Sequence, residues 1–304
     1  MPTLNDVLTA HGDYYRPGDV EWLHQLVGDW QMLSDLSFAD LVLWVPDRDG
    51  QEWVAAAHCR PSTGATVHYD DQVGRRVARS RQTLIAQAWQ SHRICRNRDP
   101  EWHDDIPVRE EAIPVVRQGV VLAVVARHTN LAAARTPSRL ELTYLQCADD
   151  LARMMAAGDF PAVGAPTGPR RGAPRVGDGL VRLDRDGRVI YASPNAQSAM
   201  HRLGYHGAVV GQPLVEVVAP LLDSSSPVDE SLPLVLAGRA PWRSDVDARG
   251  VTLSLRALPL IAAGERVAAL VLLRDVSELR RRERELLSKD ATIREVHHRV
   301  KNNL

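Results

Sequence analysis

The sequence predicts an α+β protein built from two domains, and three observations predict it. The chain has 304 residues, more than one domain usually contains. Residues 159–177 are rich in proline and glycine and show no hydrophobic periodicity, as is typical of a linker. On both sides of them, apolar stretches typical of strands alternate with stretches at helical spacing. We therefore expect antiparallel sheets with helices in residues 1–158 and 178–276, and a helix over 277–304.

The first half should begin with a helix and continue into strands. The segment VEWLHQLVGDWQML (20–33) has apolar residues at helical spacing. LVLWV (41–45) and EWVAAAH (52–58) flank the turn DRDG as the two strands of a hairpin would. AIPVV (112–116) and VVLAVVARH (120–128) predict a second hairpin, whose continuous apolar run indicates a central strand.

A second helix should close this half. Ser138 and Glu141 have the spacing of a capping box, in which each side chain bonds to the other residue's backbone N–H. The apolar residues that follow share one helix face: Leu140, Tyr144, Cys147, Leu151, Met154 and Met155. This order of helix, sheet and helix resembles a GAF domain over residues 1–158. The resemblance implies a pocket in segment 59–110 that binds a small ligand, with a cyclic nucleotide as one candidate, or a domain that only dimerises.

The expected pocket segment holds several side chains of ligand-binding type. Arginine guanidinium groups suit an anionic ligand, although such a cluster is also typical of a solvated helix face. The cluster consists of Arg75, Arg76, Arg79 and Arg81.

Imidazole, thiolate and carboxylate groups in this region are of the types that bind metal or haem. They are His92, Cys95, His103 and Asp104, with His58 and Cys59 at a strand end. Their spacing matches no known ligand signature, so the sequence predicts no metal site. Arg75, Arg79, His92 and Cys95 remain candidates for lining the pocket.

The second half should open with a hairpin and a helix. In GLVRLDRDGRVIYASPNAQSAM (179–200), two short strands surround an Asp-Gly turn, and Ser193 precedes Pro194 as a helix N-cap. Short helical stretches follow, and residues 244–276 then predict three strands.

This pattern resembles a PAS domain over residues 178–276. In that family an Asp-[Ile/Val]-[Thr/Ser] triplet joins the last strand to an output helix, and Asp275, Val276 and Ser277 match it. The resemblance implies a module that transmits a signal, with or without a bound ligand. The helix should begin at Ser277, which can cap it.

The last segment predicts a coiled-coil signalling helix that ends in a phosphorylation site. Leu279, Leu286, Ile293 and Val300 recur every seven residues, the period of a left-handed coiled coil. His298 lies two residues before Val300 and therefore faces away from that seam. A neutral imidazole in water has the lone pair needed to attack phosphorus.

The stretch REVHHRVKNNL (294–304) resembles the phospho-acceptor box of HWE-like bacterial sensor histidine kinases, whose core is His-Arg-x-Lys-Asn. The resemblance implies that His298 is phosphorylated with ATP and Mg²⁺ in the full-length kinase. The position that follows an acceptor histidine in the classical family is acidic, but here it is Arg299. Glu295 is therefore our candidate base, and Asn302 occupies the phosphatase position.

The order of the three parts resembles the soluble actinobacterial sensor kinases that phosphorylate an ANTAR-type, RNA-binding response regulator. It implies a chain that continues into an ATP-binding domain, and the coiled-coil period predicts a homodimer. No Walker motif occurs in residues 1–304, so we expect no ATP site in them. We therefore expect a sensory fragment that is inactive alone. The alternative is a ligand-binding or dimerising scaffold without enzyme activity; a cyclic-nucleotide phosphodiesterase or cyclase would need a catalytic domain that conflicts with the box.

Composition excludes other classes of protein. The 37 basic and 38 acidic residues nearly cancel, so nothing favours direct binding to nucleic acid or to an anionic membrane. The longest apolar runs, 119–126 and 267–273, are far shorter than the roughly 18 residues that span a bilayer, and no signal peptide is evident. Three cysteines at long spacings indicate neither a disulfide framework nor a zinc site. We expect a cytoplasmic protein.

Overall fold

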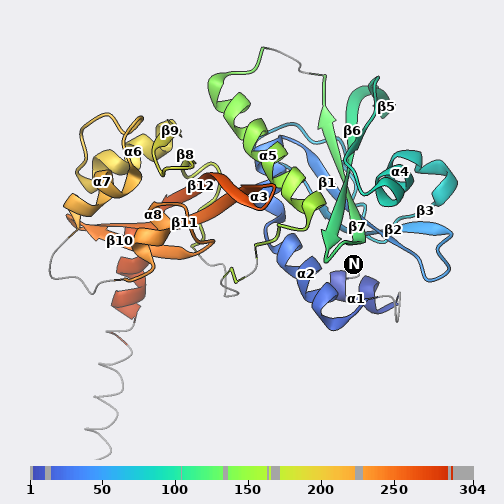
Figure 1. Cartoon of the computed structure of the whole chain (residues 1–304), viewed down its shortest axis with the longest axis horizontal. Coiled ribbons are helices and arrows are strands. Elements are labelled where there is room, and N and C mark those ends of the chain that lie inside the picture. The colour runs from blue at the N-terminus through green and yellow to red at the C-terminus, as the bar shows by residue number, and fades with distance from the viewer. Residues whose placement is uncertain are drawn as a thin grey trace, which may run out of the picture. The chain divides into compact units, whose positions relative to one another are not determined.

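The computed structural model describes residues 3–10, 15–103, 105–132, 136–162, 164–165, 172–222, 229–286 and 289. The chain divides into two compact units (Figure 1). The first comprises residues 1–167 with 260–267, and the second comprises 168–259 with 268–304. Each unit is built on one sheet with helices packed on it, which confirms the predicted α+β class.

The first unit contains a sheet in the order β3-β2-β1-β7-β6-β4, with β5 paired to β6. Both predicted hairpins are present, and β7 lies between β1 and β6, as its apolar run predicts. The elements are α1 (Leu4–Ala10), α2 (Pro17–Gly28), α3 (Trp30–Ser37), β1 (Asp40–Pro46), β2 (Glu52–Cys59), β3 (Arg76–Ala78), η2 (Arg79–Arg81), α4 (Thr83–Ser91), β4 (Cys95–Arg96), β5 (Glu101–His103), β6 (Ile106–Arg117), β7 (Val120–Asn130) and α5 (Arg139–Ala157).

Two predictions about this unit were wrong in detail. The single helix expected over 20–33 is two helices, α2 and α3, because the backbone leaves the helical region at Asp29 (φ −102°, ψ 8°). Gly28 and Asp29 both favour a helix end over a helix interior. The arginine cluster does not form a helix face either, since Arg76 lies on β3 and Arg79 in the turn η2.

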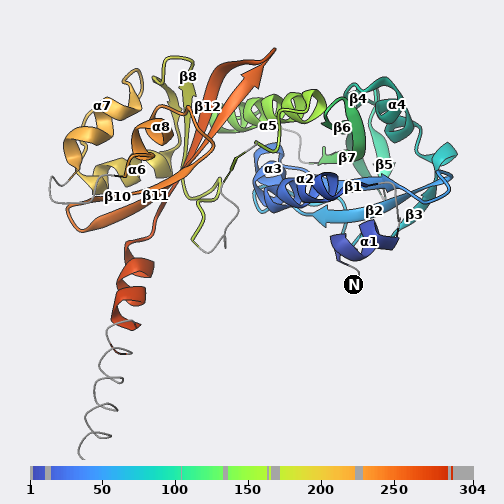
Figure 2. The same cartoon turned by 60° about the horizontal axis from the view of Figure 1, so that its bottom comes forward.

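The two faces of this sheet carry different helices (Figures 1 and 2). Leu84 and Ile85 of α4 pack with Val124 and Ala126 of β7 in one apolar cluster. Arg127 points to the opposite face, as strand alternation requires, and bonds to α5. The first face is the one that the candidate site occupies.

The predicted capping box at the start of α5 is present. The Glu141 amide donates to Ser138 Oγ at 3.2 Å, and the Ser138 amide donates to Glu141 Oε2 at 2.7 Å. Ser138→Ala should therefore lower the free energy of unfolding by about 1 kcal/mol in chemical denaturation. Thr136→Ala, an exposed neighbour, should change it by less than about 0.5 kcal/mol. Equal effects of the two changes would contradict a capping role.

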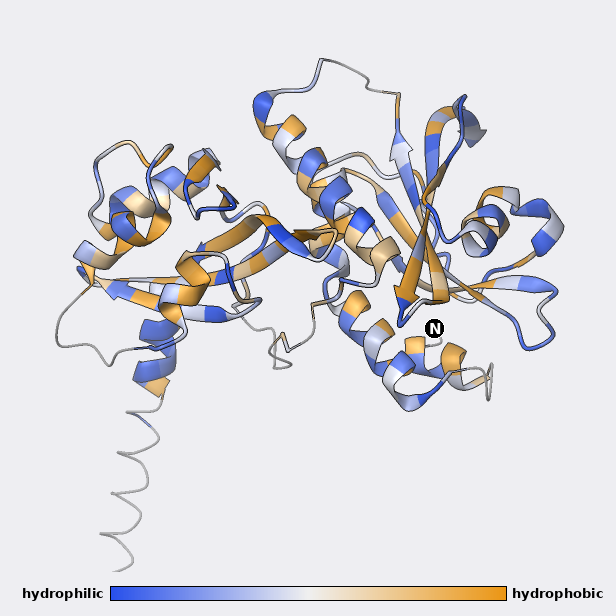
Figure 3. Ribbon diagram, viewed as in Figure 1, coloured by the Kyte–Doolittle hydropathy of each residue, from blue (hydrophilic) through white to orange (hydrophobic). Residues whose placement is uncertain are grey.

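The second unit contains a sheet in the order β10-β11-β12-β8-β9. Its core combines one face of these strands with the helices, and the alternate residues Leu253, Leu255 and Ala257 of β11 lie in it. The elements are β8 (Leu180–Asp184), β9 (Val189–Ala192), α6 (Pro194–Leu203), α7 (Leu214–Val218), η3 (Ala219–Leu221), α8 (Leu232–Leu236), β10 (Arg243–Ala248), β11 (Val251–Ala262) and β12 (Glu265–Asp275). Hydrophobic residues gather along the strands of both units (Figure 3).

The start of α6 and the end of β12 lie close to the positions that the sequence predicts. Ser193 Oγ accepts from the Ala196 amide and caps α6, with Pro194 as the first helical residue, as predicted. β12 ends at Asp275, and residues 277–286 are helical. The predicted coiled coil lies mostly outside the described residues.

Candidate functional site

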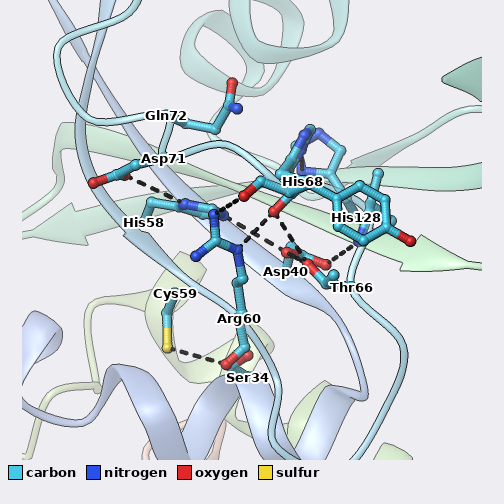
Figure 4. Close-up of polar contacts among 12 residues, drawn as sticks. Ser34, Asp40, His58, Cys59, Arg60, Thr66, His68, Asp71, Gln72 and His128 are labelled. Atoms are coloured by element: carbon cyan, nitrogen blue, oxygen red, sulfur yellow. Dashed lines mark hydrogen bonds and ion pairs between the residues drawn. The ribbon is translucent and has the colours of Figure 1, made fainter. Parts of the chain in front are cut away.

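Polar residues from four neighbouring strands meet on one face of the first sheet. Figure 4 shows those of β1, β2 and β7. Asp40 on β1 pairs directly with His128 on β7, which pairs with Glu110 on β6. His58 on β2 lies opposite Val42, two residues after Asp40. Directly opposed residues share a face of a sheet. The strand register alone therefore places two carboxylates and two imidazoles in one row.

Each imidazole of this row faces a carboxylate. His58 Nε2 lies 3.6 Å from Asp40 Oδ1, and His58 Nδ1 lies 3.5 Å from Asp71 Oδ1. Figure 4 shows His58 between these two acids. His128 Nε2 lies 3.7 Å from Glu110 Oε1. Both imidazoles therefore lie beside a carboxylate.

His68 lies among other histidines instead. Its Nε2 is 3.2 Å from His128 Nδ1, within hydrogen-bond distance, and its ring centroid is 5.7 Å from His58 and 5.9 Å from His103. Within the described ranges, no ion pair joins His68 to a carboxylate. We call these four histidines, with Asp40, Asp71 and Glu110, the histidine cluster.

The surroundings fix the charges of three groups in the histidine cluster. Burial, followed by the nearby His128, lowers the pKa of His68 to about 3. Burial alone would raise the pKa of Asp40, but hydrogen bonds from His58, Thr66 and the Val67 amide outweigh it and lower the pKa. The pKa of Glu110 is lowered in the same way, because the bond from His128 outweighs burial. At neutral pH the carboxylates are therefore ionised and His68 is neutral.

The segment 60–72 lies against the row of strand residues. Thr66 Oγ1 donates to Asp40 Oδ1 at 2.6 Å, and the Val67 amide donates to Asp40 Oδ2 at 2.7 Å. Asn130 Nδ2 donates to the Thr66 carbonyl at 3.2 Å. The Arg60 guanidinium donates to the carbonyls of His68 and Tyr69. Asp40, which is fully buried, thus holds the middle of this segment to the sheet.

The opposite face of the same strands carries a buried ion network. Arg127 Nε donates to Glu111 Oε2 at 2.5 Å, and Arg127 Nη2 lies 2.7 Å from Asp149 Oδ1 of α5. Arg96 also pairs with Glu111. Since Glu110 and Glu111 are adjacent, as are Arg127 and His128, the ion network and the histidine cluster lie back to back across β6 and β7.

The predicted arginines line a different region. Arg79 Cζ lies 4.5 Å from the centroid of the Trp53 ring, a cation–π contact that positions it in the structure. Arg75 Nη1 donates to Gln72 Oε1, and Arg76 pairs with Glu52. Arg75, Arg76 and Arg81 line a groove of about 570 Å³ beside β3. This groove offers positive charge to an anion, but Arg79 is not among its lining residues.

The other candidates do not assemble into one site. His92 is exposed at the end of α4, where it ends the helix with φ 56°. Cys95 lies on β4, and its thiol contacts Ser91 and the Arg93 carbonyl. Burial raises the pKa of Cys59 to about 11, so this thiol is protonated and unreactive. Asp104 lies outside the described residues, as do Glu295, His298 and Asn302.

No group of three or more His, Cys, Asp or Glu side chains among the described residues is arranged to hold a metal ion. None of the described helices combines the length and apolar character that a bilayer-spanning segment needs.

A second polar site lies at the N-terminal end of the helix at 277–286. The Ser277 amide and hydroxyl both donate to Asp275 Oδ1, at 3.0 and 2.6 Å. Arg202 Nε donates to Asp275 Oδ2 at 3.0 Å, and the Thr252 amide donates to Ser277 Oγ at 2.9 Å. Asp275, rather than Ser277 as predicted, therefore caps the helix, because the Ser277 hydroxyl is engaged with β11. Arg280 adds an ion pair to Asp245 of β10 at 2.6 Å.

Sequence reasoning missed the centre of the histidine cluster. It gave His58 and His103 little weight and did not single out Asp40, His68, Glu110 or His128. A signal was present, since Asp40, His58 and His128 each stand where an apolar strand begins or ends. Only the pairing register shows that these positions meet.

Two family models match the chain. Residues 4–148 match the model described as "Histidine kinase PdtaS, GAF domain", and residues 174–281 match the PAS fold. These matches confirm the predicted order of a GAF domain followed by a PAS domain.

The chain is also similar to solved and curated proteins. A structure described as "Sensor region of a sensor histidine kinase" is 42% identical, with a TM-score of 0.77 over 92% of this chain and 100% of that one. The sensor histidine kinase PdtaS of Mycolicibacterium smegmatis is 45% identical over 311 residues, and that of Mycobacterium tuberculosis H37Rv is 46% identical over 315. All of this chain is covered in both comparisons, but it spans only 62% of the length of these relatives.

Proposed function

Because the chain belongs to the family of sensor regions of sensor histidine kinases, we propose that it controls the autophosphorylation of a kinase on His298. The similarity to a solved sensor region over that region's full length carries this proposal. In the kinase, ATP bound with Mg²⁺ in an ATP-binding domain would supply the phosphoryl group and leave as ADP. His298 is the acceptor, Glu295 orients or deprotonates its ring, and Asn302 positions the water of the phosphatase reaction, which takes up the phosphoryl group and releases inorganic phosphate.

The position of His298 in the sequence supports this role. Glu295 and Asn302 are three and four residues away, so on a helix both side chains neighbour the imidazole. Arg299 and Lys301 add positive charge, which favours an incoming triphosphate.

The signal enters, in this proposal, through the GAF domain. Its ligand is a small molecule, and the groove beside Arg75, Arg76 and Arg81 favours an anionic one, such as a cyclic nucleotide. Ligand binding shifts the chain between two conformations that differ at the helix over 277–304. A coupling free energy of about 1–3 kcal/mol between the ligand site and that helix would change output several-fold or more.

The kinase acts, in this proposal, in the cytoplasm as a homodimer joined through its signalling helices. It passes the phosphoryl group to a response regulator, for which the sequence resemblance indicates the ANTAR type. The sensory region itself makes no direct contact with nucleic acid.

An autokinase assay of the intact kinase with radiolabelled ATP tests the proposal. The expected product is phosphoprotein that is stable to alkali and labile to acid, as phosphohistidine is. Cyclic mono- and dinucleotides are added in parallel, and their binding to residues 1–304 is measured by thermal shift. A folded, intact protein that takes up no phosphate under any condition would contradict the kinase and favour a scaffold.

The Asp275 carboxylate should stabilise the start of the output helix at 277–286. Asp275→Ala removes the acceptor of two hydrogen bonds from Ser277 and the partner of Arg202. Charge-assisted bonds of this kind contribute about 1.5 kcal/mol or more. Hydrogen exchange should therefore show about a tenfold loss of amide protection in 277–286. Glu285→Ala, which changes an exposed pair, should leave protection within about twofold of the parent.

A further inference from the structure

Among the described residues of the histidine cluster, His68 has no carboxylate within ion-pair distance. His58 faces Asp40 and Asp71, and His128 faces Glu110. His68 is surrounded by rings instead, with centroid distances of 4.7 Å to His128 and 5.9 Å to His103. Burial, three neighbouring histidines and the carboxylate of Asp40 together determine the cost of adding a proton to His68.

The contact between His68 and His128 can hold only one proton. Two imidazole nitrogens 3.2 Å apart form a hydrogen bond when one carries the proton and the other offers its lone pair. If His128 takes a second proton at its Nδ1 atom, it can still donate to neutral His68 and remain paired with Glu110. If both rings are charged, two N–H groups face each other across the contact. The closed arrangement therefore requires that the two rings are never both protonated, and His68 is the ring without a carboxylate.

The backbone around His68 is the part of the unit that can move when His68 is protonated. The neighbouring residues Thr66 and Val67 are held to the sheet through Asp40, and Arg60 holds the His68 carbonyl. No helix or strand runs through residues 60–72. A local opening of this segment would place His68 in water without unfolding the strands.

We propose that the protonation state of His68 controls segment 60–72. Neutral His68 holds the segment on the sheet, and protonated His68 releases it; we call this arrangement the latch. Among the described residues, the charged and titratable groups in contact with His68 or with its neighbours are Asp40 on β1, His58 on β2, Arg60 and Asp71 in the segment, His103 on β5, Glu110 on β6 and His128 on β7. Acidification therefore opens the segment. The latch itself does not depend on the kinase assignment; only its effect on a kinase does.

The pH dependence of segment opening follows from the difference between the pKa of His68 in the closed and in the open state. In water, a histidine titrates near pH 6.5, whereas burial and the other rings keep the pKa of His68 low in the closed state, at about 3. At His68, only the open state then gains a proton between pH 7.5 and 5.5. Its population relative to the closed state should rise about tenfold over this range. The ionised carboxylates Asp40 and Glu110, whose pKa values are lowered, do not oppose this change because they keep their charge throughout.

Hydrogen exchange of residues 1–304 tests the latch. Peptides covering 60–72 should lose about tenfold in protection between pH 7.5 and 5.5, after correction for intrinsic exchange, while peptides of β11 should not. His68→Gln places an amide where Nε2 lies and cannot titrate, so its loss should be less than about twofold. His92→Gln, at an exposed histidine outside the cluster, should behave as the parent.

Two results would overturn the proposal. One is constant protection of 60–72 in the parent chain over this pH range, and the other is the same tenfold loss in His68→Gln. Should that variant fail to fold, an NMR titration of the histidine-labelled parent decides. The latch requires at least one of the 11 histidines to keep an unprotonated ring down to pH 5.5. If all of them titrate above that pH, the latch does not exist.

Discussion

Replacing His298 with glutamine should abolish autophosphorylation of the intact kinase. Glutamine keeps a polar side chain of similar length but has no nitrogen lone pair that can form a phosphoramidate bond. We expect phosphate incorporation at least a thousandfold below the parent, with ATP binding unchanged. The measurement is radiolabel transfer from ATP together with nucleotide affinity, so that loss of the acceptor is separated from loss of the nucleotide site.

His297 supplies a matched control for this prediction. It is adjacent in sequence, and on the predicted helix it would be rotated by about 100° from His298, close to the predicted coiled-coil seam. His297→Gln should therefore retain phosphorylation within a few-fold of the parent. The opposite pattern, with phosphorylation lost only in His297→Gln, would show that the acceptor has been assigned to the wrong histidine.

The sequence predicted those elements of the fold that depend on neighbouring residues. Ser138 with Glu141 and Ser193 with Pro194 mark helix starts through local hydrogen bonds and a fixed φ, and both helices begin where predicted. The apolar run at 120–128 indicated a central strand, because a strand covered on both faces needs no polar residues. Short elements such as β3, β4 and β5 carry no comparable periodicity and were not predicted.

The candidate site could not be predicted in the same way, because it depends on register. Asp40, Glu110 and His128 come from three strands separated by many residues, and a shift of one residue would send each side chain to the other face. The GAF resemblance pointed to a pocket in 59–110, and this segment contains His68 and His103. It could not indicate that Arg79 packs on Trp53 or that Asp275, rather than Ser277, accepts the capping bonds.

The ion network on the opposite face of the first sheet was not predicted from the sequence either. Breaking it should cause a large loss of stability. Arg127 is 8% exposed at its side chain and Glu111 is 7% exposed, so neither charge can turn to water. Arg127→Leu should therefore lower the free energy of unfolding by about 3 kcal/mol, since it leaves the Glu111 carboxylate buried with only Arg96 near it. Chemical denaturation monitored by tryptophan fluorescence measures the change.

The double change Arg127→Leu with Glu111→Leu tests whether the ion network stabilises the unit by pairing charges or by side-chain packing. A buried ion pair gains little over well-packed apolar residues, because desolvation of both charges offsets their attraction. The double variant should therefore lie within about 1 kcal/mol of the parent, with Asp149 and Arg96 exposed enough to be hydrated. Arg153→Leu, which removes an arginine from an exposed pair with Asp150, should cost less than about 0.5 kcal/mol. If the double variant is as unstable as Arg127→Leu, the network stabilises the unit through the shape of the arginine rather than by neutralising Glu111.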